Sequence, residues 1–245
     1  MSHDKIKSAA RERMAKTGEP YAAARREVIR EHQAAANCAP LPGGGVLLWI
    51  NGPCGVGKKT TASELNRRLP GSVVCAPGAV GMAMHRMLPP SVRRMWQDIP
   101  AWRYSVLELL RLTLAGHDGP VIAPGTLVDR GHFREIIGSL RDDGVEVHHF
   151  ALLAEPATVV HRLRARSLGL EPRTQPWETR VLDEWLEQLR RPEFAQHIQT
   201  DHQNVTQVAD VIARSAGLTI RPPTGGPVRA WVHRYATTMR HIRWA

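Results

Sequence analysis

Three glycines and a lysine lie close together in the segment that runs from Gly52 to Lys58. Glycines let the backbone turn tightly with its N–H groups pointing inward, and a lysine beside them adds a mobile positive charge. An apolar run over 46–50 precedes the segment and a helical pattern over 62–69 follows it. This strand, loop and helix order is that of a phosphate-binding P-loop, with Lys58 reaching the outer phosphates. The residues predicted to bind the nucleotide are Gly52, Pro53, Cys54, Gly55, Val56, Gly57, Lys58, Lys59 and Thr60.

The loop departs from the usual pattern at one position. The pattern G-x-x-x-x-G-K-[ST] asks for a hydroxyl that binds Mg²⁺, and this chain has Lys59 there. An ammonium repels a metal ion, and a lost charge-assisted contact costs about 1.5–3 kcal/mol. The nearest hydroxyl along the chain is that of Thr60, one residue after the position that the pattern requires. Thr60 is therefore the candidate metal ligand, and it can take this place only if the loop shifts. The alternative, a glycine-rich turn without a ligand, does not account for the lysine in its strand and helix context.

Composition limits the class of protein. The chain has 245 residues, of which 42% are hydrophobic, enough for one large α/β domain with appendages. Its longest apolar runs are too short to span a bilayer, and its charged N-terminus lacks the apolar segment of a signal peptide. Three scattered cysteines form no disulfide or zinc pattern. We therefore expect a cytoplasmic protein.

The net charge of +10 is concentrated at the two ends of the chain. Residues 221–245 contain five arginines and no acid, and residues 1–45 contain eight basic against five acidic residues. An excess of positive charge favours anionic partners such as nucleotides, nucleic acid or acidic lipid.

We expect three regions. Residues 1–45 hold two short helices over 4–34, broken near Gly18, and a linker rich in glycine and proline. A DNA-binding helix-turn-helix is one interpretation, but a basic hairpin that docks on a partner or on the main domain is favoured, and nucleic-acid binding is not expected. Residues 46–220 form the main domain. Residues 221–245 form a hinge and a basic amphipathic helix over 228–244, which suits an anionic membrane surface or docking on the parent domain equally well.

The main domain alternates strand and helix patterns, including a helix expected over 92–97. Such alternation predicts a five-stranded parallel sheet with helices on both faces. Ligands bind at the carboxyl ends of parallel strands, which places the glycine loop, 77–78, 126–129 and 200–201 on one rim. The predicted strands are Val46–Ile50, Val73–Cys75, Val121–Pro124, Val145–Leu153 and His197–Thr200.

The chain resembles the tunicamycin-resistance protein family, small ATP-binding members of the P-loop kinase group, over residues 46–243. The resemblance is carried by several ordered segments besides the P-loop: Trp49-Ile50-Asn51-Gly52, Glu64-Leu65, Arg68-Leu69, Val80-Gly81, Arg86-Met87, Pro124 with Thr126, Phe133 with Glu135-Ile136-Ile137-Gly138, Val147-His148-His149-Phe150, Arg162-Leu163-Arg164 and His197-Ile198-Gln199-Thr200-Asp201.

The resemblance implies a nucleoside-monophosphate-kinase-like fold, ATP and Mg²⁺ as cofactors, and protection against a nucleoside-like antibiotic. It implies either phosphoryl transfer to the drug or ATP-dependent sequestration, and a membrane-associating tail. One departure concerns an acidic pair that the family usually shows after the second strand. Ala76 and Gly78 stand at the matching positions, so both the metal hydroxyl and the candidate base are missing from their usual places.

The sequence offers further candidate residues. Asp129, on the predicted rim, replaces the missing acid or is a surface residue paired with Arg130 or Arg134. Arg162 and Arg166 share one helix face where P-loop kinases have a lid, and either close over the transferred phosphate or form a solvated basic face. The candidate catalytic residues are therefore Lys58, Asp129, Arg162 and Arg166. Trp96 and Trp102 either stack on a nucleoside ring or pack in the core, and His148 and His149 are predicted to be strand residues.

Overall fold

The computed structural model describes residues 3–28, 45–165 and 180–223, and it divides the chain into two compact units, Met1–Pro42 and Gly43–Ala245. The predicted helix over 228–244 lies outside the described residues, so its binding to lipid stays a prediction, as do the two boundaries between the three proposed regions. Of the helices that are described, none is long and apolar enough to cross a membrane.

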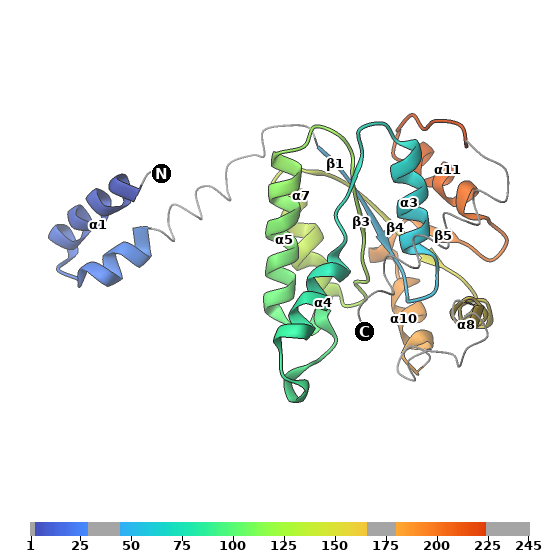
Figure 1. The fold of residues 1–245 in the computed structure, drawn as a ribbon, viewed down its shortest axis with the longest axis horizontal. Helices are drawn as coiled ribbons and strands as arrows, with labels where there is room; N and C mark the ends of the chain where they lie inside the picture. The colour runs from blue at the N-terminus through green and yellow to red at the C-terminus, as the bar shows by residue number, and fades with distance from the viewer. Residues whose placement is uncertain (1–2, 29–44, 166–179, 224–245) are drawn as a thin grey trace. The chain divides into compact units, whose positions relative to one another are not determined.

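The smaller unit contains helix α1, His3–Thr17, and a second helical stretch over 21–28 (Figure 1). Gly18 lies between them in the left-handed region, with φ +71°, and its N–H bonds the carbonyl of Met14. Ala10, Ala24 and Val28 are buried within the described part of this unit. The two short helices predicted there are confirmed as far as residue 28.

The larger unit is built on a five-stranded sheet, and all its strand pairs are parallel. The strand order is β2-β3-β1-β4-β5, so β1 lies in the middle and carries the chain into the glycine loop. From Leu47 to Asn51 it is buried, because strands and helices cover it on both sides. The strands are β1 Val46–Asn51, β2 Val73–Val74, β3 Val121–Pro124, β4 Glu146–Leu153 and β5 His197–Gln199.

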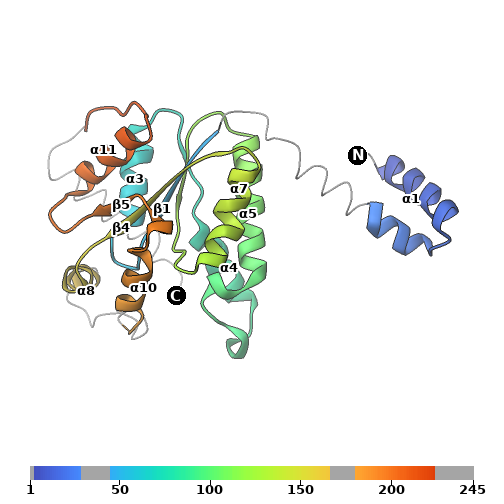
Figure 2. The same ribbon diagram turned by 180° about the vertical axis from the view of Figure 1, so that it is seen from behind.

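Helices cover both faces of the sheet, as predicted. Figures 1 and 2 show α3 and α11 on one face and α5 and α7 on the other. Arg68 links the first pair, because its guanidinium contacts Asp210 on α11 at 2.7 Å and its Nε donates to the carbonyl of Arg221 at 2.8 Å. The helices are α3 Lys58–Arg68, α4 Pro77–Met87, α5 Pro100–Ala115, α6 Arg130–Phe133, a π-helical turn Arg134–Gly138, α7 Ser139–Asp142, α8 Pro156–Ala165, α10 Leu182–Leu189 and α11 Val205–Ser215.

The prediction of a helix over 92–97 is wrong. Two short 3-10 turns, Pro90–Val92 and Trp96–Asp98, occupy this region, because the prolines before and after it interrupt helical hydrogen bonding. The ring of Trp96 lies against Gly81 of α4, so close that an added Cβ would be 2.4 Å from it. Trp102 is buried and its Nε1 donates to the carbonyl of Pro77 at 3.1 Å. Both tryptophans therefore pack against α4.

Candidate nucleotide site

The glycine loop leaves β1 through backbone conformations that favour glycine. Gly52, Gly55 and Gly57 have φ values of +141°, +85° and +111°. A Cβ on Gly52 would lie 2.7 Å from the carbonyl oxygen of Leu152, and one on Gly55 would lie 2.8 Å from Cγ of Leu163. The loop is thus held tightly against β4 and α8, which only glycine permits at these positions.

The N-terminus of α3 is arranged to receive an anion. Its N-cap residue is Gly57, which has no side chain to bond the first-turn N–H groups, and the first turn carries no acidic residue. In contrast, α11 begins with a complete capping box between Asn204 and Gln207. Uncapped N–H groups and the positive end of the helix dipole together favour a phosphate at the start of α3.

Lys58, the first residue of α3, folds back over the loop. Its ammonium donates to the carbonyls of Gly52 at 2.6 Å and Pro53 at 2.8 Å. The Thr126 hydroxyl, which follows β3, donates to the same Gly52 carbonyl at 2.9 Å. The lysine charge is therefore placed beside the loop that the sequence assigned to phosphate.

Asn51, the last residue of β1, connects the glycine loop to the segment after β3 and to β4. This fully buried side chain accepts hydrogen bonds at Oδ1 from the N–H groups of Gly52 (2.8 Å) and Leu127 (2.9 Å). Its Nδ2 donates to the carbonyl of Leu127 at 2.8 Å and lies 3.1 Å from Nε2 of His149. Its importance was not predicted, although a polar residue that ends an otherwise apolar strand is the signal for such a role.

The partners of Asn51 fix the protonation state of His149. Because Oδ1 faces two backbone donors, Nδ2 must donate to His149, whose Nε2 therefore accepts. The proton of the neutral ring is then on Nδ1, which donates to the carbonyl of Ala195 at 3.1 Å. Burial between Phe133 and Phe194 lowers the pKa of His149 to about 4. His149 is thus a neutral strand residue that supports the loop.

Arg162 of α8 connects the loop with the end of β5. Its Nη1 contacts the carbonyl of Val56 at 3.3 Å and the hydroxyl of Thr200 at 2.9 Å, and Nη2 donates to the Thr200 carbonyl at 2.6 Å. These contacts place Arg162 at the loop, whereas its predicted catalytic role stays a prediction. Arg166 lies outside the described residues, so its part in the site stays a prediction.

Asp129 caps the short helix α6 after β3. It accepts the backbone N–H of His132 at 2.8 Å, and this bond lowers the pKa of the carboxyl. The side chain is 58% exposed. Arg130 pairs with Glu193 at 2.6 Å instead, and no ion pair joins Asp129 to Arg130 or Arg134 among the described residues. Asp129 is therefore ionised and accessible near the rim, although its role as a base stays a prediction.

The residues around the loop fit a nucleotide phosphate better than they fit Mg²⁺. Magnesium asks for oxygen ligands, typically one or two carboxylates besides the phosphates. Lys59 replaces the usual hydroxyl, the first turns of α3 and α4 carry no acid, and Asp129 is engaged in capping. Over the ranges that the structure describes, no three His, Cys, Asp or Glu side chains are grouped to hold a metal. Thr60 remains the candidate ligand, without a carboxylate cluster to complete the site.

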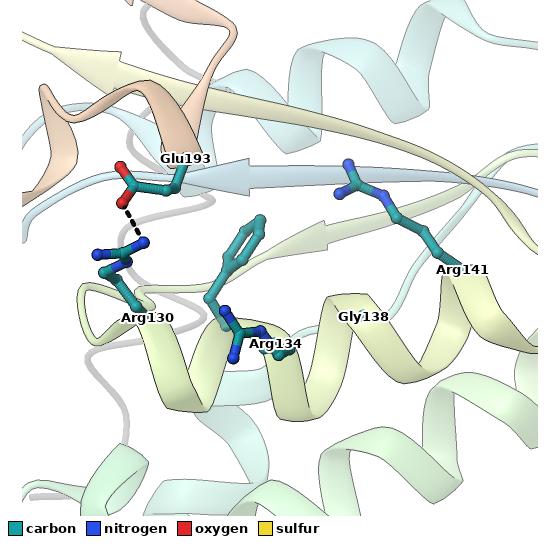
Figure 3. A pocket seen from close by; sticks show the side chains of 6 residues that line it. Arg130, Arg134, Gly138, Arg141 and Glu193 are labelled. Atoms are coloured by element: carbon teal, nitrogen blue, oxygen red, sulfur yellow. Dashed lines mark ion pairs between the residues drawn. The ribbon is translucent and has the colours of Figure 1, made fainter.

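A second feature is a basic hollow of about 200 Å³ beside the helix that runs from α6 to α7 (Figure 3). It contains none of the predicted site residues, and its lining combines an ion pair, an aromatic ring and two further arginines. The lining residues are Arg130, Phe133, Arg134, Gly138, Arg141 and Glu193.

The sequence and the fold of this chain were compared with those of known proteins. A family model described as an AAA domain matches residues 47–192. A tunicamycin resistance protein from Deinococcus radiodurans is 34% identical, covers 72% of this chain and 99% of its own, and superposes with a TM-score of 0.60. The chain belongs to the tunicamycin-resistance protein family. The resemblance predicted from the sequence is thereby confirmed.

Proteins of lower sequence identity share the fold of this tunicamycin-resistance family member. A gluconokinase from Sinorhizobium meliloti 1021 is 17% identical, covers 72% of this chain and 95% of its own, and has a TM-score of 0.51. At this identity the match shows the fold alone, that of the P-loop kinases. No curated protein matches the chain.

Proposed function

We propose that this chain is an ATP-binding resistance protein that transfers a phosphoryl group to a nucleoside-like antibiotic such as tunicamycin. The observation that carries the proposal is the loop of Gly52, Gly55 and Gly57 with Lys58 folded over it, at the uncapped start of α3. Kinship with a tunicamycin resistance protein over nearly all of that protein's length supports the choice of acceptor.

Each side chain has a defined part in the proposed reaction. Bound ATP supplies the γ-phosphoryl group. Loop N–H groups and Lys58 neutralise charge on the phosphates, and Arg162 keeps the loop in shape through Val56 and Thr200. The acceptor hydroxyl oxygen forms a bond to phosphorus as the bond to the leaving oxygen of ADP breaks. The carboxylate of Asp129 orients that hydroxyl and receives its proton.

A second candidate function is binding without transfer. Lys59, Ala76 and Gly78 stand where a metal ligand and acidic groups are expected, which favours a protein that retains the phosphate site and sequesters the drug. The two candidates share the loop and Lys58, and they differ in whether the drug leaves chemically changed.

Mass spectrometry of tunicamycin after incubation with the protein and Mg²⁺-ATP separates the two. Transfer gives a product heavier by one phosphoryl group, which Lys58→Ala abolishes. Unmodified drug that co-purifies with the protein in the presence of ATP indicates sequestration. Drug that is neither modified nor retained contradicts both candidates. Circular dichroism of Lys58→Ala checks that the variant is folded.

A further inference from the structure

The positive charge at the start of α3 is doubled. Lys58 and Lys59 are its first two residues, and Lys59 is exposed. Lys58 extends over the loop towards the carbonyls of Gly52 and Pro53. The side chain of Lys59 has a flexible four-carbon stem and begins in the same turn as the uncapped N–H groups. The first turn of α3 therefore carries two positively charged side chains at the end of the helix where the phosphate is expected.

The opposite charge that a metal ion needs is scarce at the same place. The first turns of α3 and α4 contain no acidic residue, and Ala76 is the N-cap of α4. The rim segments 126–129 and 200–201 contribute Asp129 and Asp201, whose carboxylates accept the backbone N–H groups of His132 and Glu155. Among the residues that the structure describes, a divalent cation beside Lys59 would meet a like charge without a group of acidic ligands to compensate it.

We propose that this P-loop binds nucleoside triphosphate without a divalent cation, with Lys59 supplying the positive charge that the metal brings in other P-loops. The inference rests on the proposed nucleotide site and extends it from the ligand to its ionic form. A lysine can neutralise phosphate as a point charge. It cannot bridge two phosphate oxygens and align them as a metal does. We therefore expect the affinity for nucleotide to be retained and the rate of phosphoryl transfer to be reduced.

Isothermal titration calorimetry with ATP, in excess EDTA and in excess Mg²⁺, tests the proposal on the full chain. We expect the two dissociation constants of the wild type to agree within about threefold. Lys59→Thr restores the usual hydroxyl and removes the charge, so its affinity in EDTA should fall about tenfold or more, as loss of one charge-assisted contact implies. Mg²⁺ should recover that affinity. Lys59→Arg keeps the charge and should behave as the wild type.

Arg67→Thr is the matched control, because it removes one positive charge from the last turn of the same helix. Its ATP affinity should be unchanged in both buffers, and thermal melting of each variant checks that it is folded. Wild-type protein that binds ATP only with Mg²⁺ overturns the inference and leaves the proposed function intact. Binding in neither buffer overturns the nucleotide site itself. If Lys59→Thr binds normally in EDTA, Lys59 does not replace the metal.

Discussion

Asn51 makes buried hydrogen bonds with backbone groups of Gly52 and Leu127 and with the His149 ring, and truncation of its side chain removes all of these bonds together. Asn51→Ala strands two backbone N–H groups, a carbonyl and the ring of His149 in a dry environment. We expect the free energy of unfolding in urea to fall by about 2–4 kcal/mol. Asn66→Ala, at an exposed position of α3, is the matched control and should cost less than about 0.5 kcal/mol. Equal effects of the two variants would contradict this role.

His149 should make the stability of the protein depend on pH. Its pKa is lowered from 6.5 to about 4 in the folded state, so the unfolded chain binds more protons between these values. Its contribution is fully present above pH 6.5 and is lost as the pH falls towards 4, by about 3 kcal/mol at most.

Urea unfolding at several pH values measures this dependence. His149→Gln should flatten the curve between pH 6.5 and 4 relative to the wild type. A His149→Gln curve parallel to that of the wild type would show that the ring does not stay neutral.

At the scale of elements, α4 offers a paired test of packing. Gly81→Ala places a Cβ 2.4 Å from the Trp96 ring, so we expect it to lower the free energy of unfolding by about 1–3 kcal/mol. Gly78 lies in the same helix with nothing within 4 Å of an added Cβ. Gly78→Ala should be neutral or stabilise by up to about 1 kcal/mol, because alanine favours helix. The melting temperatures of the two variants give the comparison. An unchanged melting temperature of Gly81→Ala would show that the Trp96 ring does not contact Gly81.

The sheet and the glycine loop could be predicted because their signals are local. Apolar runs bounded by glycine and proline mark strands, and Gly57-Lys58 marks the loop from neighbouring residues alone. The support beneath the loop could not be predicted, because Asn51 and His149 are 98 positions apart and meet only through the pairing of β1 with β4. The failed helix over 92–97 has a local cause instead, because the prolines before and after it interrupt helical hydrogen bonding.

At the scale of the whole molecule, the division into two units makes a prediction about the first 42 residues. The family match covers residues 47–192, and the core of the larger unit is formed by its own sheet and helices. A chain shortened to begin at Gly43 should keep its melting temperature within about 2 °C and its ATP affinity within about threefold. Differential scanning calorimetry and titration calorimetry check these two values. A large loss of either would show that the smaller unit completes the fold or the site.

The π-helical turn in the helix beside the basic hollow has a consequence for how this chain can change in length. A π-helical turn holds one residue more than an α-helical turn, so it is the natural place for a helix to gain or lose a residue without breaking. Loss of one residue from Arg134–Gly138 would restore α-helical winding, and because each π-helical residue turns the helix less than an α-helical residue does, Arg141 would keep about the same facing relative to Arg130. A single deletion there would therefore shorten the helix by one residue while Arg130 and Arg141 stayed on the side of the hollow seen in Figure 3.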